Sequence, residues 1–301
     1  MAKEKRIYFA STFQTLDMPT IRSFDFSFPV VLGLLFALQA QGQASKELDP
    51  MTPPPNFFAV SREFVKPGKD LLYNEIETDG ARVCGRMKCP NSYLAISSIT
   101  GPSQVWWLTP FDSFLDLERI ASGYGSNPAL LTELAHIVER KADIVTPPEL
   151  LYAEYRKDLS HDGGLDLRHA RFLSITSFKI APGRTEEFEQ LQRIQKSAYE
   201  RAGVEDGHWV YQVFSGGSDY EFFVIRPLVA LSDLERVRDF YGAKFQAAIG
   251  PSRADIHRLT AAAILSSTTY LFTPNPAWSY LPKDWIATDP QFWDAAAVKE
   301  K

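Results

Sequence analysis

FFAVSREFVKPGK, residues 57–69, is the stretch that decides the fold, because its pattern returns as FLSITSFKIAPGR at residues 172–184. Both copies have an apolar run followed by a Pro-Gly turn signal. A second match, the tetrapeptide DLER, occurs at residues 116–119 and again at residues 233–236. Two separate matches at nearly one offset indicate an internal duplication.

The first repeat is predicted to span residues 57–159. Its opening strand ends at the Pro-Gly turn, and a helix over residues 69–83 would present Leu71, Leu72 and Ile76 on one face. Further elements follow from alternation and from turn residues: strands at 93–99 and 104–109, a largely helical stretch at 113–141 that is interrupted at 123–128, and a strand at 149–155.

The second repeat, residues 171–275, shows the same order. Its predicted elements are a strand at 172–180, a helix at 185–202, strands at 209–214 and 220–226, helical segments at 231–248 and 254–263, and a strand at 268–273. Each half therefore reads β-α-β-β-α-β, the ferredoxin-like order that forms a four-stranded antiparallel sheet with both helices on one face.

The sequence thus predicts an α+β protein of two tandem ferredoxin-like repeats. The aromatic pairs Trp106-Trp107 and Phe222-Phe223 on the third strand of each repeat indicate that both faces of each sheet are buried. Packing the two sheets against each other within one chain would bury them as an intramolecular α/β barrel.

In this order of elements, the Pro-Gly turn and the tandem copy, residues 57–275 resemble the dimeric α/β-barrel superfamily. That superfamily includes the antibiotic-biosynthesis-monooxygenase-like and NIPSNAP-like proteins. The resemblance implies a ligand site between a sheet and its helices. It also implies activities that range from cofactor-free oxygenation to haem chemistry, and members with no known activity.

The N-terminal 44 residues are predicted to be a signal peptide, so we expect an exported protein. Residues 28–40 form an uncharged apolar run that is short for a membrane span, and Gly42-Gln43-Ala44 has a small-x-small pattern. Met18 is an alternative start, and an amphipathic core helix is an alternative structure. Prolines mark residues 45–56 as a linker, and we expect no integral membrane segment in the mature chain.

Composition limits the classes of partner. The formal net charge of −5 argues against a nucleic-acid binder, and a hydrophobic content of 45% is typical of a soluble globular protein. Because the duplication supplies both halves of a barrel, we expect a monomer. A C-terminal tail, residues 276–301, holds half of the six tryptophans and is predicted to wrap over the helices as a strap.

Cys84 and Cys89 lie in a predicted short connection, where a local disulfide would form after export. The inter-repeat linker, residues 160–170, contains His161, Asp162, Asp166 and His169, but a solvated loop explains them better than a metal site. We therefore predict no metal site.

No cofactor is expected, with haem as the alternative. His136 and His257 occupy near-equivalent places in the last helix of each repeat. In haem-binding relatives a helical histidine ligates iron, so the resemblance makes these two residues the haem candidates. Packed or surface histidines are the simpler interpretation.

Catalytic candidates come from an asymmetry between the repeats. Arg62 and Glu63 stand where the second repeat has Ser177 and Phe178, so one copy could have kept a site while the other became structural. Glu63 or His208 would act as a base and Arg62 would hold an anion. Residues proposed for an aromatic ligand pocket, with cross-strand pairing as the alternative, are Trp107, Trp209, Tyr211, Tyr220 and Glu221.

The leading functional prediction is binding of a small apolar or aromatic molecule. The first alternative is a cofactor-free oxygenase-like or isomerase-like enzyme with a pocket in one repeat. The second is a structural or interaction protein with a solid core. Nucleophile elbows, phosphate loops and dinucleotide fingerprints are absent from the sequence.

Overall fold

The computed structural model describes residues 54–161, 163, 166–204, 206–239 and 242–294. The predicted signal peptide and most of the predicted linker lie outside the described residues. The first repeat has this order: β1 (Phe57–Phe64), α1 (Asp70–Met87), β2 (Leu94–Ser98), β3 (Gln104–Phe111), α2 (Phe114–Gly125), α3 (Pro128–Lys141) and β4 (Glu149–Tyr155).

The second repeat follows the same plan with a more divided helical segment. After a single-turn helix, η1 (Leu167–His169), it consists of β5 (Phe172–Ile180), α4 (Thr185–Ala202), β6 (Trp209–Ser215), β7 (Glu221–Leu228), α5 (Asp233–Asp239), α6 (Ala243–Ile249), η2 (Gly250–Ser252), α7 (Arg253–Ala263) and β8 (Ile264–Pro274). The predicted β-α-β-β-α-β order is confirmed in both halves.

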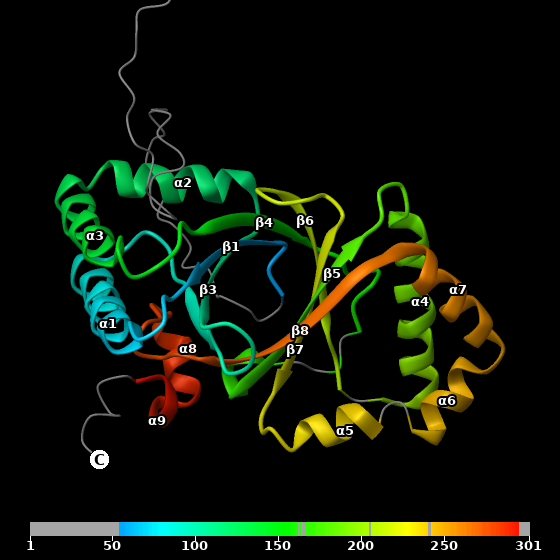
Figure 1. Cartoon of the computed structure of the whole chain (residues 1–301). Coiled ribbons are helices and arrows are strands. Elements are labelled where there is room, and N and C mark those ends of the chain that lie inside the picture. Colours follow the sequence, from blue (N-terminus) through cyan, green and yellow to red (C-terminus); the bar gives the residue numbers. More distant parts are fainter. Residues whose placement is uncertain (1–53, 162, 164–165, 205, 240–241, 295–301) are drawn as a thin grey trace, which may run out of the picture.

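The eight strands close into one antiparallel barrel in the order β1-β3-β2-β8-β5-β7-β6-β4 (Figure 1). Within each repeat the first strand lies between the third and fourth strands. Two junctions join the repeats, β4 with β6 and β2 with β8. The predicted intramolecular α/β barrel is therefore confirmed.

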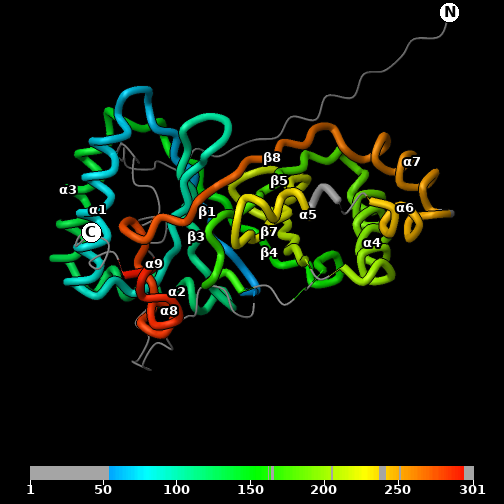
Figure 2. Tube along the Cα trace, turned by 90° about the horizontal axis from the view of Figure 1, so that it is seen from below, coloured from blue at the N-terminus to red at the C-terminus, as the bar shows by residue number. Residues whose placement is uncertain are grey.

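Alternate residues of the strands point into the barrel, as the two-residue period of a strand requires. All eight strands contribute to one interior core, which includes Phe58, Leu94, Trp106, Leu151, Ile175, Trp209, Phe223 and Phe272. The helices lie outside. Figure 2 shows α1 and α3 at one side of the barrel and α4, α6 and α7 at the opposite side. Each repeat thus has a second core between its sheet and its helices.

The buried face of α1 differs from the prediction. Leu71 and Leu72 are 84% and 42% exposed, and the buried residues are instead Tyr73, Ile76, Glu77, Gly80, Val83 and Cys84. These six residues follow the three-and-four spacing of a helix face, whereas Leu71 and Leu72 lie in the first turn. Because the wrong face was predicted to be buried, the buried carboxylate of Glu77 was not predicted.

The helix α1 also extends further than predicted, to Met87, and Lys88 closes it with a positive φ of 59°. Cys84 consequently lies in the last helical turn, not in a connection. The structure joins it to Cys89, with Cα atoms 4.7 Å apart. The disulfide ties the end of α1 to the segment that leads into β2.

The C-terminal strap continues with α8 (Lys283–Thr288) and α9 (Pro290–Trp293). Its beginning packs on α1, where the Trp278 ring meets Tyr73 edge-on and Nε1 donates to the Asn74 side chain at 3.0 Å. Trp285 and Trp293 instead join the barrel-interior core. Trp293 also donates to the carbonyl of Arg168 at 2.7 Å, so the strap closes part of the barrel against the inter-repeat linker.

Replacing Trp285 by Ala should reduce the free energy of unfolding by about 3–5 kcal/mol, because the side chain is fully buried and would leave a large cavity. Denaturant unfolding measures this loss. Phe114→Ala, at a ring that is 55% exposed, is the control and should cost less than about 1 kcal/mol. Equal losses in the two variants would contradict the placement of the strap.

Candidate functional site

The alternation of β1 separates the two charged residues that the sequence singled out. Arg62 shares its face with Phe58 and Val60 and points into the barrel. Glu63 points to the opposite face, toward α1 and α3, and is 1% exposed. The structure therefore places the two side chains on opposite faces of the sheet and does not bring them together in one pocket.

Glu63 belongs to a buried ionic cluster that includes Glu77 of α1 and Lys141 of α3, 4% and 7% exposed. The ammonium of Lys141 donates at 2.7 Å to Glu63 Oε1 and at 2.7 Å to Glu77 Oε1. The Tyr73 hydroxyl donates to Glu63 Oε2, also at 2.7 Å. One cation thus bridges two carboxylates that come from a strand and a helix.

Helical periodicity brings these groups inward. The buried positions of α3 are Leu130, Leu134, Ile137 and Lys141. Because these positions are three or four residues apart, they share one helix face, and Lys141 is buried together with the apolar side chains. Asn127 caps the start of this helix by accepting from the Leu130 N–H at 3.1 Å. The ammonium therefore lies at the fixed C-terminal end of α3, where a cation also interacts favourably with the helix dipole.

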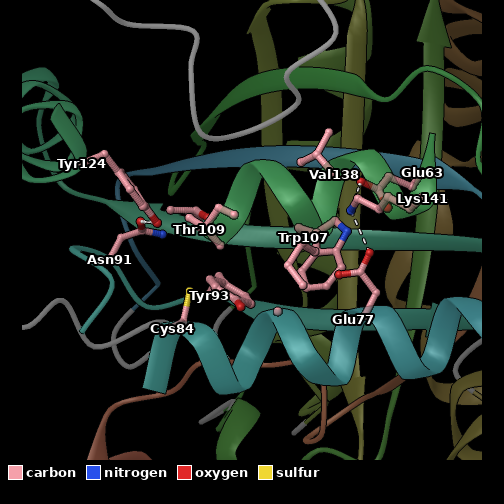
Figure 3. A pocket seen from close by; sticks show the side chains of 13 residues that line it. Glu63, Glu77, Cys84, Asn91, Tyr93, Trp107, Thr109, Tyr124, Val138 and Lys141 are labelled. Atoms are coloured by element: carbon pink, nitrogen blue, oxygen red, sulfur yellow. Dashed lines mark hydrogen bonds and ion pairs between the residues drawn. The ribbon is translucent and has the colours of Figure 1, made fainter. Parts of the chain in front are cut away.

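A cavity of about 90 Å³ lies beside the cluster, between the sheet and the helices of the first repeat. Figure 3 shows Glu63, Glu77 and Lys141 at one end, Asn91 and Tyr124 at the other, and Tyr93 and Trp107 between them. The remaining lining is mostly apolar and consists of Gly80, Cys84, Thr109, Leu134, Ile137 and Val138. The disulfide forms part of this wall.

Two buried polar atoms on this side of the sheet have no hydrogen-bond partner among the described residues: Trp107 Nε1 and Ser61 Oγ. The two residues are paired across β1 and β3, so their side chains share a face. An unpaired buried donor is unfavourable and is normally satisfied by a water molecule or a ligand. Trp107 lines the cavity, and its buried N–H lies beside the Tyr73 hydroxyl of the cluster.

Glu77 Oε2 is a second polar atom beside the cavity, one to which Lys141 does not donate. Lys141 occupies Oε1, and Oε2 lies toward Gly80, where an added Cβ would come within 3.9 Å of it. Burial raises the pKa of Glu77 to about 7; the charge of Lys141 lowers it, and the charge of Glu63 raises it further. Glu77 can therefore gain or lose a proton near neutral pH.

Lys141 and Tyr73 keep their protons over the whole neutral range. Burial alone would lower the pKa of Lys141, but the charges of Glu77 and Glu63 raise it above its ordinary value. Burial, with the same two carboxylates, raises the pKa of Tyr73 well above its ordinary value. Glu77 is consequently the group of this cluster that is suited to exchange protons with a ligand.

The second repeat lacks this site at the equivalent place. The residues 115 positions after Glu63, Tyr73 and Glu77 are Phe178, Phe188 and Gln192, respectively. The ring of Phe188 packs at 5.3 Å from Phe178 and 4.6 Å from Phe222, which fills the space between sheet and helices. The second repeat is therefore packed with aromatic rings at the place where the first repeat has its ionic cluster.

Arg62 is held inside the barrel as a structural cation. Its guanidinium lies 4.6 Å from the Trp106 ring centroid and 4.8 Å from that of Phe223, and it donates to Glu221 at 2.9 Å. Ser177 donates to the same carboxylate at 2.9 Å. These contacts join the two repeats across the barrel.

The residues predicted to form an aromatic pocket do not come together. Trp107 lines the cavity of the first repeat, while Trp209 and Tyr211 are buried in the barrel interior. Tyr220 packs on the helix side of the second repeat, and Glu221 binds Arg62. Of the set, Trp107 alone contributes to the described cavity.

His208 is buried in the second repeat, away from Glu63. It lies edge-on to Tyr199 at 5.4 Å, its backbone pairs with that of His161, and its Nδ1 has no partner among the described residues. Burial, with the nearby charge of Arg226, lowers the pKa of His208 well below its ordinary value. His208 therefore packs as a neutral imidazole against Tyr199 and does not lie in the same site as Glu63.

The haem candidates do not fit a haem ligand. His136 is exposed on α3, where Nδ1 lies 3.3 Å from Glu139, and His257 is exposed on α7 beside a shallow hollow. Neither imidazole faces an enclosed apolar space, so no step is assigned to haem. Among the described residues, no three histidine, cysteine or acidic side chains gather as a metal site. Asp166 instead binds Arg168, and Asp162 lies outside the described residues.

Sequence reasoning missed Glu77, Lys141 and Tyr73, although a signal for each was present. Glu77 falls on the buried stripe of α1, three or four residues from Tyr73 and Gly80, and Lys141 continues the apolar stripe of α3. A charged residue on an otherwise apolar helix face is a sign of a buried ion pair or a site. Two such residues on neighbouring helices would have identified the cluster.

The chain has the dimeric α/β-barrel fold, with both halves of the barrel in one polypeptide. Its sequence matches no protein-family model and no curated protein. In the described part of the chain, no helix combines the length and apolarity needed to cross a membrane.

Several solved structures are similar. A candidate monooxygenase from Fusobacterium nucleatum is 12% identical over 73% of this chain and 93% of its own, with a TM-score of 0.47. An anthrone oxidase-like protein is 15% identical over 73% and 92%, with a TM-score of 0.48. A chlorite dismutase variant from Candidatus Nitrospira defluvii, in complex with cyanide, is 11% identical over 74% and 92%, with a TM-score of 0.44. At these values the likeness carries no functional argument.

The pH dependence of stability tests the raised pKa of Glu77. The folded chain holds the Glu77 proton up to about pH 7, whereas the unfolded chain releases it near 4.5. The Glu77 contribution therefore makes the folded state lose stability as the pH rises from about 4.5 to 7, and levels off above. Relative to Glu77→Gln, the wild-type free energy of unfolding should fall by up to roughly 3 kcal/mol across that window. Parallel pH curves for the two proteins would contradict the assignment.

Removing the bridging cation should be strongly destabilising. Lys141→Met leaves Glu63 and Glu77 buried without a counter-charge, and we expect a loss of about 3–5 kcal/mol at pH 8. The loss should be smaller at pH 5, where a carboxyl can take up a proton. The neighbouring Arg140→Met, which breaks an exposed pair with Asp79, is the control and should cost about 1 kcal/mol or less. The comparison needs denaturant unfolding at both pH values.

Proposed function

We propose that the chain is an exported, monomeric small-molecule-binding protein whose site is the cavity of the first repeat. The observation that carries this proposal is the buried Glu63–Lys141–Glu77 cluster at the end of that cavity. A protein that needed only a stable core would gain little from such a cluster, because desolvation of the charges opposes their attraction.

The duplication supports a functional role for the cluster. The second repeat has the same elements and fills the same space with Phe178 and Phe188. The fold therefore does not require charges at this place, because the second repeat has the same order of elements without them. This also argues against the alternative of a protein with a solid core in both repeats.

The lining indicates a ligand that is small and has both apolar and polar parts. Tyr93, Trp107 and Ile137 offer apolar and aromatic surface, while Glu77 and the Trp107 N–H offer hydrogen bonds. Sites of this kind combine a mostly apolar wall with a few polar groups that orient the ligand. A cavity of about 90 Å³ selects a ligand of only a few non-hydrogen atoms.

A second candidate function is proton-transfer catalysis, favoured by a carboxyl that titrates near neutral pH inside a cavity. Glu77 would take a proton from a C–H or O–H acid of the substrate, and the electron pair would stay on the substrate. Return of the proton to another carbon gives an isomerase-like reaction. In the oxygenase-like form, the carbanion would add molecular oxygen to give a hydroperoxide in place of the C–H bond, and loss of water from that hydroperoxide would leave a carbonyl group. The dimeric α/β-barrel resemblance agrees with either form.

Filling the cavity tests the site without disturbing its charges. Gly80→Ala adds a methyl group that would contact Ile137 at 3.5 Å and occupy cavity space, whereas Gly85→Ala in the same helix meets nothing within 4 Å. Both changes should stabilise α1 by about 0.5–1 kcal/mol through helix propensity. Only Gly80→Ala should weaken, at least tenfold, the binding of hits from a fragment screen followed by NMR.

Equal affinities in the two variants would place the ligand elsewhere. The catalytic candidate is tested by following hydrogen–deuterium exchange into bound C–H acids with wild-type protein and Glu77→Gln. Exchange that is equally fast in both would remove Glu77 as the base.

A further inference from the structure

We propose that the ligand of this cavity is a small organic ammonium ion that also carries an oxygen acceptor, as a short amino alcohol does. This inference rests on the proposed function and names the chemical class that the same site would take.

The ionic cluster carries a net negative charge when both carboxylates are ionised. With both carboxylates ionised, Glu63, Glu77 and Lys141 sum to one negative charge, and all three are nine-tenths or more buried. Among the residues that line the cavity, Lys141 is the one cation. A buried charge without a counter-charge is strongly unfavourable, so a cationic ligand would complete the cluster where a neutral ligand could not.

A second cation could be bound beside Glu77 Oε2. The Lys141 ammonium lies between the two Oε1 atoms, and Tyr73 occupies the other oxygen of Glu63. Glu77 Oε2 faces Gly80 and is the carboxylate oxygen left for a further donor. An ammonium group placed there would lie on the side of Glu77 away from Lys141, in an alternating series of charges.

The cavity has aromatic walls. Tyr93, Trp107 and Tyr124 line the cavity, and the rings of Tyr93 and Trp107 meet edge to face at 5.5 Å. Lys141 Nζ already lies 5.6 Å from the Trp107 ring centroid. Aromatic rings beside a carboxylate favour an organic cation through cation–π attraction and remain suited to its methylene groups.

The unpaired Trp107 Nε1 is an independent observation on the same ligand. Trp107 is 8% exposed, and its N–H, although it lies beside the Tyr73 hydroxyl, makes no hydrogen bond of normal geometry among the described residues. A hydroxyl or carbonyl oxygen on the ligand would accept this hydrogen bond. The ligand therefore needs a cationic donor at one end and an oxygen at the other, separated by a short apolar linker that suits the small cavity.

The test titrates three probes of similar size, ethanolamine, n-propylamine and ethylene glycol, into the full chain by NMR at pH 8. Ethanolamine should bind most tightly, n-propylamine about tenfold more weakly, and ethylene glycol not measurably. Glu77→Gln should weaken both amines at least tenfold, and the exposed Glu139→Gln on α3 should leave them unchanged. Trp107→Phe should remove the preference for ethanolamine over n-propylamine.

Proton linkage gives a second readout. At pH 6 amine binding should release a proton, because the ligand cation displaces the Glu77 proton, so amine affinity should fall below pH 7. Lys141, Glu63, Tyr73 and Tyr93 are the other titratable groups that face Glu77, and Lys141, Tyr73 and Tyr93 stay protonated in this range because their pKa values are raised.

The outcomes separate this inference from the proposed function. If neutral fragments bind in a way that Gly80→Ala weakens, while neither amine binds, the cavity is a ligand site and the cation inference is overturned. If no fragment of any charge responds to Gly80→Ala, the proposed function fails as well. Amine binding that survives Glu77→Gln unchanged also overturns the inference.

Discussion

One buried ammonium, that of Lys141, organises the helix side of the first repeat. It connects β1 through Glu63 and α1 through Glu77 to the end of α3, each at 2.7 Å. Because a buried cation needs both carboxylates and both carboxylates need the cation, the three elements must keep their mutual positions. The cavity beside them is consequently fixed in place by charge, while its walls are mostly apolar. Burial, with the charge of Glu63, outweighs the opposing charge of Lys141 and raises the Glu77 pKa to about 7.

Duplication explains how the chain tolerates such a costly arrangement. The barrel interior is packed by residues of all eight strands and cross-linked by Arg62 and Glu221, and the second repeat packs Phe188 where the first has Tyr73. Trp285 and Trp293 of the strap add further apolar contacts to that interior. These apolar contacts stabilise the barrel and the second repeat. The first repeat keeps polar groups that reduce stability and that, on the proposed function, bind a ligand.

The fold was largely predictable from the sequence, because it depends on patterns that are local or repeated. The copy of residues 57–69 at 172–184 located the first strand of each repeat, and the strand at 149–155 has the predicted bounds. The site was predictable only in part. Glu63 stood out because the duplicate has Phe178, but the face of β1 on which it lies follows from the barrel. Its partners Glu77 and Lys141 are more than ten positions away. The exposed Leu71 and Leu72 led to the wrong face of α1, and with it the position of Glu77 was missed.

The most direct test of this account is a carbon-13 NMR titration of the glutamate side-chain carboxyls, with Glu77→Gln used to assign the Glu77 signal. The account predicts that one buried carboxyl titrates near pH 7, that this signal is missing in Glu77→Gln, and that ligand binding shifts its titration. A Glu77 carboxyl that titrates near its ordinary value of 4.5 would contradict it. In that case the attraction of Lys141 would fully offset the burial of the Glu77 carboxylate, and the cavity would no longer be supported as the functional site.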